Sequence, residues 1–369
     1  MGNCTLRQDN YDPTVVLSRQ QFTFLYPIGK GGFGKVWKVI MKKNKEQYAM
    51  KEMLKARIIS KRSVHSVMNE RRLLAMIKHP FIVNMQYAFQ CRENLYLVMD
   101  LMPGGDLRYH LGKNRKFSED QTRFFVSCLF CALEYLHVNN IIHRDIKPEN
   151  LVLDAKGYVR LTDFGIARVW QQENGHETSG TPGYMAPEVI CRQNHTIAAD
   201  YFAVGVIVYE FMLGKRPYVG KTRKDIRDAI LAKQVQLKKT DMPQGWSLEA
   251  LDFTNKLLQR KPQNRLGYGG PQEVKNHAWL KDVDWGRLLQ KTHESPFIPK
   301  SQDNFDASQV SNDWKDEVEK IDLKDVSTQN MFIGYFYDAT LPSHKANSSS
   351  TLPNMLNADQ SVNISNLTK

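Results

Sequence analysis

Cysteine is scarce in this chain of 369 residues. There are five, an odd number, and a chain of this size does not need disulfides to stabilise its core. Long apolar runs are also missing: the longest, residues 201–213, is shorter than the roughly 20 residues that cross a membrane, and it contains Glu210. No stretch resembles a secretory leader. We therefore expect a reduced, cytoplasmic protein without a membrane span.

The composition excludes extensive disorder. Hydrophobic residues make up 41% of the chain and charged residues 24%, close to the average for globular proteins once the 22 glycines are added. At roughly 150 residues per domain, the length corresponds to about two core-forming units. The 17 Phe, 15 Tyr and 6 Trp supply enough bulk to fill them.

The net charge of +12 is concentrated in one part of the chain. Residues 30–78 contain fourteen lysines and arginines against three glutamates, whereas residues 301–338 contain nine acids and three lysines. The basic part lacks the interleaved aromatic residues and the modules typical of nucleic-acid binding, so we expect no nucleic-acid partner. Two interpretations stay open: attraction to an anionic membrane, and a solvated face balanced by the acidic stretch.

Hydrophobic periodicity divides the chain into two parts. Residues 22–99 alternate with a period of two in several places, which predicts strands, and one helix is expected over residues 57–77. The pattern then becomes helical, most clearly over residues 121–138 and 201–213. We expect an α+β protein with a β-rich first lobe and a mainly helical second lobe. The Ser/Asn-rich end after residue 339 is expected to be disordered.

A glycine-rich segment near the start of the β-rich lobe fits the pattern G-x-G-x-x-G-x-V between Gly29 and Val36. Glycines without side chains let backbone amides approach phosphate oxygens. Alternating apolar residues follow, which predicts a returning strand and therefore a flap, whereas a dinucleotide-binding fold would continue into a helix. An ordinary glycine-rich hairpin is the alternative.

Two charged residues of this lobe are predicted to meet. Lys51 lies on an apolar strand, where a charge is costly unless it is paired. Glu70 shares the inward face of the expected helix with Val67, Leu74 and Ile77. An inward glutamate needs a cation, so we predict a pair between Lys51 and Glu70, with two unrelated surface charges as the alternative.

Three segments of the second lobe occur in a fixed order: an Ile-His-Arg-Asp-Ile-Lys-Pro-Glu-Asn run at 142–150, Asp-Phe-Gly at 163–165, and Ala-Pro-Glu at 186–188. Asp145 can accept a hydroxyl proton, and Lys147 can steady a transferring phosphoryl group. Asn150 and Asp163 are hard oxygen ligands suited to Mg²⁺.

With these motifs, the chain resembles the eukaryotic protein kinases over residues 22–338. The resemblance implies a bilobal fold, with an N-lobe at 22–101, a C-lobe at 102–280, an extension at 281–338, an N-terminal segment at 1–21 and a tail at 339–369. It implies ATP as a substrate and Mg²⁺ as the metal, which Mn²⁺ can replace. Met99 would be the gatekeeper of a hinge. The implied ATP-binding residues are Ile28, Gly29, Lys30, Gly31, Gly32, Phe33, Gly34, Lys35, Val36, Ala49, Lys51, Met99, Asp100 and Met102.

The same resemblance assigns roles to the other motifs. Asp145 would be the catalytic base, supported by Lys147, Lys51, Glu70 and Thr181, with Asn150 and Asp163 holding the metal. Lys147 and Thr181 are similar to residues of the serine/threonine branch rather than the tyrosine branch. Glu188 would pair with Arg265 and brace the floor on which the substrate binds. A catalytically weak scaffold with a kinase fold is the alternative, but none of the reactive groups is lost.

The tail resembles that of the AGC kinases, the group named after the cyclic-nucleotide-dependent and C-type enzymes. The Pro-Phe-Ile-Pro run at 296–299 and the Asn-Phe-Asp run at 304–306 look like the segment that wraps the lobes. A hydrophobic motif, expected to dock on the first lobe beside the helix of Glu70, consists of Phe332, Tyr335, Phe336 and Tyr337. Within the group, the residues around Asp106 look closest to the lipid-anchored YANK branch.

Departures from the family concern its regulatory sites. Glu177 replaces the threonine that AGC kinases usually phosphorylate, and it would face the cations of Arg144 and Arg168. Phe336 replaces the usual Ser/Thr of the hydrophobic motif. We expect activity without phosphorylation of the loop, with Thr178 as a shifted acceptor site as the alternative. Two smaller departures are Gly183, where the family usually has Glu, and Phe202, where it usually has Trp. By resemblance they concern peptide docking and local packing, and neither is part of the phosphate chemistry.

Substrates and location are also implied by resemblance. Asp106, Glu149 and Glu210 match acids that favour arginine or lysine upstream of the target residue, so we expect a basophilic signalling kinase that acts on proteins as a monomer. Gly2 and Cys4 resemble a myristoylated glycine beside a palmitoylated cysteine. Two acyl chains would tether the protein to the inner face of a membrane. A chance glycine after the start codon is the alternative.

Overall fold

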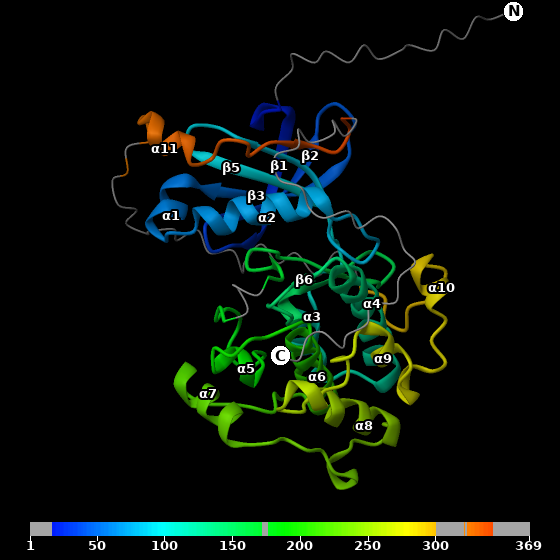
Figure 1. The fold of residues 1–369 in the computed structure, drawn as a ribbon. Coiled ribbons are helices and arrows are strands. Elements are labelled where there is room, and N and C mark those ends of the chain that lie inside the picture. Colours follow the sequence, from blue (N-terminus) through cyan, green and yellow to red (C-terminus); the bar gives the residue numbers. More distant parts are fainter. Residues whose placement is uncertain (1–16, 172–175, 300–320, 322, 342–369) are drawn as a thin grey trace, which may run out of the picture.

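The computed structural model describes residues 17–171, 176–299, 321 and 323–341. They form two lobes, a sheet with helices beside it and a mainly helical body (Figure 1). The expected α+β class is confirmed. The predicted acylation site, the run at 304–306 and the terminus after residue 341 lie outside the described residues.

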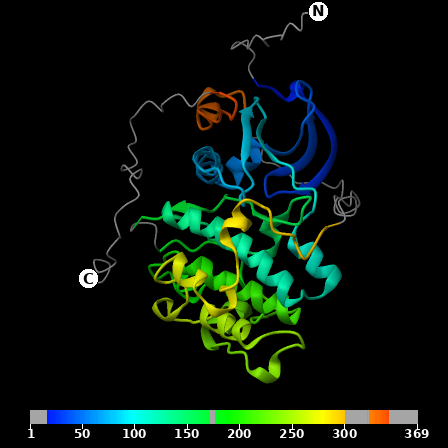
Figure 2. The ribbon, with the colours of Figure 1, turned by 90° about the vertical axis from the view of Figure 1, so that its right-hand side faces the viewer.

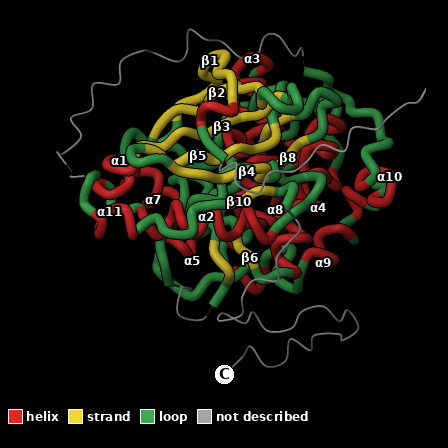
Figure 3. The backbone as a smooth tube through the Cα atoms, turned by 90° about the horizontal axis from the view of Figure 1, so that it is seen from above, coloured by secondary structure: helices red, strands yellow, loops and turns green. Residues whose placement is uncertain are grey.

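The first lobe is built on an antiparallel sheet in the order β1-β2-β3-β5-β4-β10 (Figure 3). Alternate residues of β5 join different apolar clusters: Leu95 and Leu97 belong to the main core, and Tyr96 and Val98 to a smaller cluster. Because successive side chains point to opposite faces, the sheet is apolar on both sides. The strands are β1 (Phe22–Lys30), β2 (Gly34–Met41), β3 (Gln47–Leu54), β4 (Met85–Gln90), β5 (Asn94–Asp100) and β10 (Tyr337–Asp338).

Two helices follow β3, so the prediction of one continuous helix over residues 57–77 is wrong. A turn separates α1 (Lys55–Ser60) from α2 (Val64–Met76), and within it Arg62 adopts a φ of 51°. A left-handed residue cannot continue a right-handed helix. The apolar periodicity crosses the break because α1 buries Ile58 in the same core that α2 faces.

The second lobe is mainly helical, as predicted, and two long helices form its centre (Figure 1). α4 (Glu119–Val138) begins at a capping box: the Gln121 amide donates to the Ser118 hydroxyl, and the Ser118 amide donates to the Gln121 side chain. α6 (Ala198–Leu213) ends at Gly214, whose φ of 73° is left-handed. Nearly every residue of α6 is buried, which is typical of a core helix.

Shorter elements surround this pair of helices. Two small sheets pair β6 with β9 and β7 with β8. The strands are β6 (Ile141–Ile142), β7 (Leu151–Leu153), β8 (Val159–Leu161) and β9 (Arg168–Val169). The helices are α3 (Leu107–Asn114), α5 (Pro187–Ile190), α7 (Arg223–Ala232), α8 (Leu248–Leu257), α9 (Pro271–Lys275) and α10 (Trp285–Leu289). Single turns of 3₁₀ helix lie at η1 (Arg19–Gln21), η2 (Pro148–Asn150), η4 (Lys239–Asp241), η5 (Pro262–Asn264) and η6 (Ala278–Leu280).

Near its end the chain returns to the first lobe, where α11 (Val326–Asn330) lies beside the sheet and β10 pairs with β4 (Figures 1 and 2). Phe332 and Tyr335 are fully buried there. Lys55 of α1 is buried with them: its Nζ lies 5.1 Å from the centre of the Phe332 ring and donates, at 2.7 Å each, to glutamine side chains of β4 and α11. Phe336, in contrast, is exposed.

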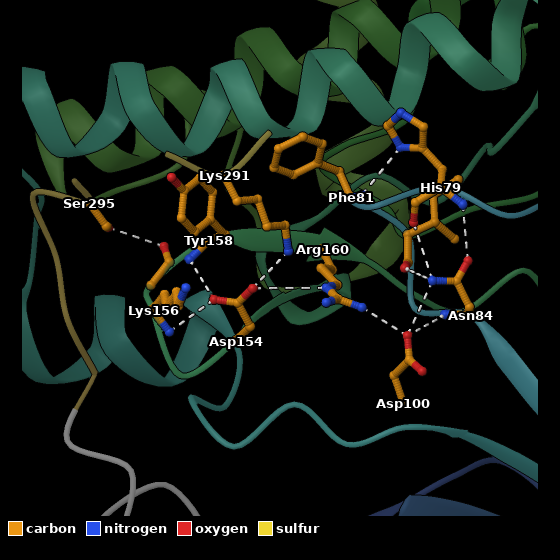
Figure 4. Close-up of polar contacts among 12 residues, drawn as sticks. His79, Phe81, Asn84, Asp100, Asp154, Lys156, Tyr158, Arg160, Lys291 and Ser295 are labelled. Atoms are coloured by element: carbon orange, nitrogen blue, oxygen red, sulfur yellow. Dashed lines mark hydrogen bonds and ion pairs between the residues drawn. The ribbon is translucent and has the colours of Figure 1, made fainter. Parts of the chain in front are cut away.

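A polar network braces the end of β5 against the second lobe (Figure 4). Asp100 accepts a hydrogen bond of 2.8 Å from Arg160 of β8 and bonds of 3.2 Å from the backbone and side chain of Asn84. Oδ2 of Asp154 lies 4.0 Å from Nε of Arg160 and accepts a 2.8 Å hydrogen bond from Lys291. The two lobes are therefore linked by charge where the chain passes from one to the other.

The described cysteines are free thiols. Cys128 and Cys131 have C-x-x-C spacing on α4, and both are buried in the main core. Burial raises the pKa of the Cys131 thiol to about 12, and that of Cys128 well above its usual range. Both therefore act as neutral core side chains rather than as a reactive pair. In the part of the chain that the structure describes, no helix combines the length and apolar character that a membrane crossing requires.

An ion pair is buried in the second lobe. Arg265 donates to both oxygens of Glu188, at 2.6 and 2.9 Å, and also to the Ala198 carbonyl at 2.8 Å. Both charged side chains are buried: the exposed fraction is 0% for Arg265 and 2% for Glu188. The pair therefore connects α5, the start of α6 and the segment after η5.

We predict that Arg265→Met lowers the free energy of unfolding by about 3–5 kcal/mol, because it leaves the Glu188 carboxylate buried without a cation. Urea denaturation measures the loss. Arg123→Ala is the matched control: Arg123 pairs with Asp120 at the surface, and an exposed pair contributes less than about 1 kcal/mol. Equal, small losses in both variants would contradict a structural role for the buried pair.

Candidate active site

A cleft of about 760 Å³ lies between the lobes, a volume typical of small-molecule sites. It is lined by the glycine-rich loop, β3, α2, the end of β5 and loops of the second lobe. Gly34 and Lys35 lie outside this lining. Of the residues predicted to bind ATP, the cleft contains Ile28, Gly29, Lys30, Gly31, Gly32, Phe33, Val36, Ala49, Lys51, Met99, Asp100 and Met102.

The glycine-rich loop is the turn of the hairpin between β1 and β2. Lys30 pairs with Lys35 across the turn, and the Gly31 amide donates to the Gly34 carbonyl at 2.8 Å. A Cβ on Gly34 would lie 1.7 Å from the backbone oxygen of Glu52, so only glycine allows β2 and β3 to approach this closely. A strand follows the loop, as the flap interpretation predicts, and not the helix of a dinucleotide-binding fold.

Lys51 of β3 and Glu70 of α2 form the predicted ion pair. Nζ of Lys51 lies 2.9 and 3.1 Å from the two oxygens of Glu70. Burial disfavours the charged lysine, but the charges of Glu70 and Asp163 outweigh it and raise the pKa of Lys51. Burial also opposes ionisation of Asp163, but the charge of Lys51 prevails and lowers its pKa. Three charged groups from three segments thus meet in the cleft.

Asp145 lines the cleft and forms a closed set of contacts with Lys147 and Thr181. Lys147 donates to Asp145 Oδ2 at 2.6 Å and to Thr181 Oγ1 at 2.8 Å, and the Thr181 hydroxyl donates to Asp145 Oδ1 at 2.7 Å. Asn150 donates to the backbone oxygen of Asp145 at 2.8 Å and to Oδ2 at 3.1 Å. Every polar atom of the Asp145 carboxylate is therefore held by a donor.

Asp200, at the start of α6, holds this loop in place, a role that the sequence analysis missed. Its buried carboxylate accepts hydrogen bonds from the backbone amides of His143, at 3.0 Å, and Arg144, at 2.8 Å, and lies 2.9 Å from Nε2 of His137. Burial opposes ionisation, but the hydrogen bond and charge of His137 outweigh it and lower the pKa of Asp200. An aspartate in a largely apolar helix was the available signal, because a buried carboxylate needs donors.

The oxygen donors predicted for a metal fit a hard divalent cation. Asn150 uses its amide nitrogen on Asp145, so its Oδ1 is the atom left for a cation. Asp163 is ionised beside Lys51, and both Asn150 and Asp163 line the cleft. Carboxylate and amide oxygens combined with phosphate oxygens suit Mg²⁺ better than softer metals.

Glu177 contacts two arginines from separate segments. Its Oε2 lies 2.7 Å from Nη1 of Arg144 and 3.9 Å from Nε of Arg168. Partial burial opposes ionisation, but the hydrogen bond and charge of Arg144, together with Arg168, lower the pKa of Glu177. Thr178 is exposed, and its hydroxyl donates to the Val189 carbonyl at 3.3 Å. Glu177, and not Thr178, therefore meets these two cations.

The three acids predicted to bind substrate lie around α3. Asp106 is the N-cap of α3 and accepts a 2.8 Å hydrogen bond from the Tyr109 amide. Arg108, which the sequence analysis did not single out, joins Glu149 to Glu210 by bonds of 3.0 and 2.8 Å. The structure thus brings the acids to one region and places a cation among them.

The charged residues of the cleft were predicted from the sequence, but part of its uncharged lining was not. The missed residues include Val83, Val152 and Thr162. Single residues of this kind have no chemical signature in a sequence. Only the pairing of distant strands places them opposite the glycine-rich loop.

This fold and this cleft define a two-lobed phosphotransferase, and comparison with known proteins agrees. Residues 22–280 match the protein kinase domain family, and the chain belongs to that family. It is a protein serine/threonine kinase of the AGC group.

Three curated relatives illustrate the similarity. A Dictyostelium discoideum protein named "probable serine/threonine-protein kinase" is 38% identical over 88% of this chain and 72% of its own length. The serine/threonine-protein kinase sgk-1 of Caenorhabditis elegans is 38% identical over 79% of this chain and 63% of its own. The yeast serine/threonine-protein kinase YPK2/YKR2 of Saccharomyces cerevisiae is 36% identical over 87% of this chain and 48% of its own.

We predict that Glu70→Gln lowers the pKa of Lys51, because it removes the nearest carboxylate from a buried ammonium. At a fixed pH of about 9, below the usual lysine pKa near 10.4, a larger neutral fraction then reacts faster with an amine-acylating reagent. Peptide mass spectrometry gives the labelling rate at Lys51. Glu52→Gln is the control, since Glu52 accepts from Trp37 instead. Equal labelling rates in the two variants would contradict the prediction.

Proposed function

We propose that this kinase transfers the γ-phosphoryl group of ATP to serine and threonine hydroxyls of proteins, with Asp145 as the catalytic base. One observation carries the proposal: Asp145, which Lys147 and Thr181 contact, lines the same cleft as Lys51 and Glu70. Phosphoryl transfer needs positioning and charge more than covalent chemistry, and these groups supply both.

Each group has a role in this mechanism. Asp145 orients the substrate hydroxyl and accepts its proton, while Thr181 and Lys147 keep the carboxylate aligned. Lys147 also balances negative charge on the transferring phosphoryl group. Lys51, oriented by Glu70, binds the α and β phosphates.

The nucleotide would lie between the glycine-rich loop and the hinge. Amides of the loop cover its phosphates, and the backbone at Asp100 and Met102, next to Met99, binds adenine. Asn150 and Asp163 would hold Mg²⁺, or Mn²⁺ in its place, which neutralises phosphate charge when bound. A catalytically weak scaffold is the alternative, and the intact contact set of Asp145 argues against it.

We predict that Asp145→Asn lowers turnover by about 10²–10⁴-fold, because an amide cannot accept the proton. The assay is ATP turnover on a serine peptide, using protein expressed in bacteria and treated with phosphatase. Asp120→Asn, on the exposed face of α4, is the matched control and should keep full activity. Unchanged turnover in Asp145→Asn would exclude it as the base.

We further propose that activity does not require phosphorylation of the loop. Glu177 already provides a carboxylate to Arg144 and Arg168, the two cations that a phosphate would bind. The hydrophobic motif is buried through Phe332 and Tyr335 without a phosphorylatable residue at Phe336. The contact with the two arginines and the docking of the hydrophobic motif therefore both form without a phosphate group.

Glu177→Ala should lower kcat by on the order of tenfold, since it leaves Arg144 and Arg168 without a carboxylate. Thr178→Ala is the comparison and should leave kcat unchanged, because the Thr178 hydroxyl donates to the backbone oxygen of Val189 and not to a charged group of the site. Both are measured on phosphatase-treated protein. The reverse result, with full activity in Glu177→Ala and loss in Thr178→Ala, would make Thr178 the acceptor site and sink the built-in carboxylate.

The remaining proposals concern substrates and location. Asp106, Glu149 and Glu210 support a preference for arginine or lysine upstream of the target residue, as in a basophilic signalling kinase that acts as a monomer. We also propose that the segments of the chain end at residues 21, 101, 280 and 338, and that the chain belongs to the YANK branch. Acylation of Gly2 and Cys4, which lie outside the described residues, would tether the cytoplasmic protein to an anionic membrane surface.

A further inference from the structure

The acids proposed to read upstream arginine already hold an arginine of the chain itself. Arg108 of α3 donates through Nη1 to Glu210 Oε1 at 2.8 Å and through Nη2 to Glu210 Oε2 at 3.1 Å. Its third nitrogen, Nε, donates to Glu149 Oε1 at 3.0 Å. A two-pronged arginine–carboxylate contact is the geometry that a substrate arginine would otherwise make.

Both oxygens of Glu210 already accept hydrogen bonds from within the chain. The Tyr184 hydroxyl donates to Oε2 of Glu210 at 2.5 Å and also contacts Arg108. The Glu210 side chain is 6% exposed, and Tyr184 is buried. Burial opposes the charge of Arg108, but the hydrogen bond and charge of Glu210, with Tyr184 and Glu149, outweigh it and raise the pKa of Arg108. An incoming guanidinium would therefore have to displace Arg108 first.

Asp106 and Glu149 differ from Glu210 in two respects. Both line the cleft, whereas Glu210 does not, and the Glu149 side chain is 43% exposed. Asp106 accepts from backbone amides at the start of α3, including that of Tyr109, and Glu149 accepts from Arg108 through Oε1. Burial and the charge of Glu149 raise the pKa of Asp106, as expected for two neighbouring carboxylates. This pair is open to a cation that approaches along the cleft.

A second guanidinium lies near the ring of Tyr184. Arg216 is 5.9 Å from the centre of the Tyr184 ring, and its Nη1 would lie 2.8 Å from a Cβ at Gly183. The family usually has glutamate at the position of Gly183. The glycine removes this carboxylate, and Arg216 lies where its side chain would begin. Tyr184 therefore lies near two guanidinium groups, those of Arg108 and Arg216, as well as the Glu210 carboxylate.

We propose that Arg108 is a specificity-determining residue that closes the Glu210 subsite, so that substrates are read through one upstream cation, bound by Asp106 and Glu149. The inference rests on the proposed function and narrows it. A resident arginine competes at a high effective concentration, because the chain holds it next to Glu210, whereas a substrate arginine must be captured from solution.

The test measures kcat/KM for peptides that differ only upstream of the target serine. One peptide has no arginine, one set has a single arginine at each of the five preceding positions, and one set has every pair of arginines. The wild type should gain on the order of tenfold from the best single arginine and less than about twofold from a second. Arg123→Ala, at the surface of α4, should give the wild-type pattern.

Arg108→Ala should open the closed subsite, so that a second arginine raises kcat/KM on the order of tenfold. Arg108→Ala combined with Glu210→Gln should lose that gain, because the acceptor carboxylate is gone. Since Arg108→Ala leaves Glu210 buried without a cation, its folding needs a check, and Glu210→Gln alone gives an independent test. In the presence of Arg108, Glu210→Gln should leave the ratio of two-arginine to one-arginine peptides unchanged.

The proposal is overturned if the wild type gains as much from the second arginine as from the first, or if Glu210→Gln alone reduces that second gain. It is also overturned if folded Arg108→Ala shows the same second-arginine response as the wild type. The basophilic preference is judged separately: it fails if the wild type gains nothing from any single arginine. In that case a second-arginine gain that appears only in Arg108→Ala would still support closure of the Glu210 subsite.

Discussion

The buried carboxylate of Asp200 is the constraint on which the site depends. It holds the amides of His143 and Arg144, and Arg144 keeps a left-handed φ of 68° as a result. That backbone orientation directs the Arg144 guanidinium to the Ile166 carbonyl and to Glu177, while Asp145 follows one residue later in the cleft. One buried charge at the start of α6 therefore positions both the proposed base and the arginine that meets the loop.

Three ion pairs inside the described part of this protein join distant segments. Lys51 and Glu70 join the sheet to α2, Glu188 and Arg265 join α5 to the segment after η5, and Arg108 joins α3 to Glu210 of α6. A charge taken out of water is costly unless it is paired or hydrogen-bonded: these residues have ion pairs, whereas the buried Lys55 has hydrogen bonds to two glutamines. The pairs differ in their access to a ligand. Lys51 lines the cleft although it is paired with Glu70, whereas Glu210 lies outside the cleft lining and both its oxygens accept from Arg108.

How far the sequence could predict the site depended on the kind of signal. Some requirements can be recognised locally in the sequence. Gly34 lies in the hairpin, where a side chain would clash with β3, and Lys51 forms an ion pair with Glu70. The break between α1 and α2 was missed because the apolar periodicity continues across it. The break rests on the conformation of Arg62, and nothing in the sequence distinguishes this arginine from its neighbours.

The sequence by itself determined the class of protein, because the chemistry of phosphoryl transfer demands particular residues in a particular order and those residues are present. Tertiary structure alone decided what the surrounding charges do. Arg108 is separated by 41 residues from Glu149 and by 102 from Glu210, and their contact exists only because α3, η2 and α6 pack together. Ion pairs between distant residues depend on geometry in space, and a pattern along the chain does not encode that geometry.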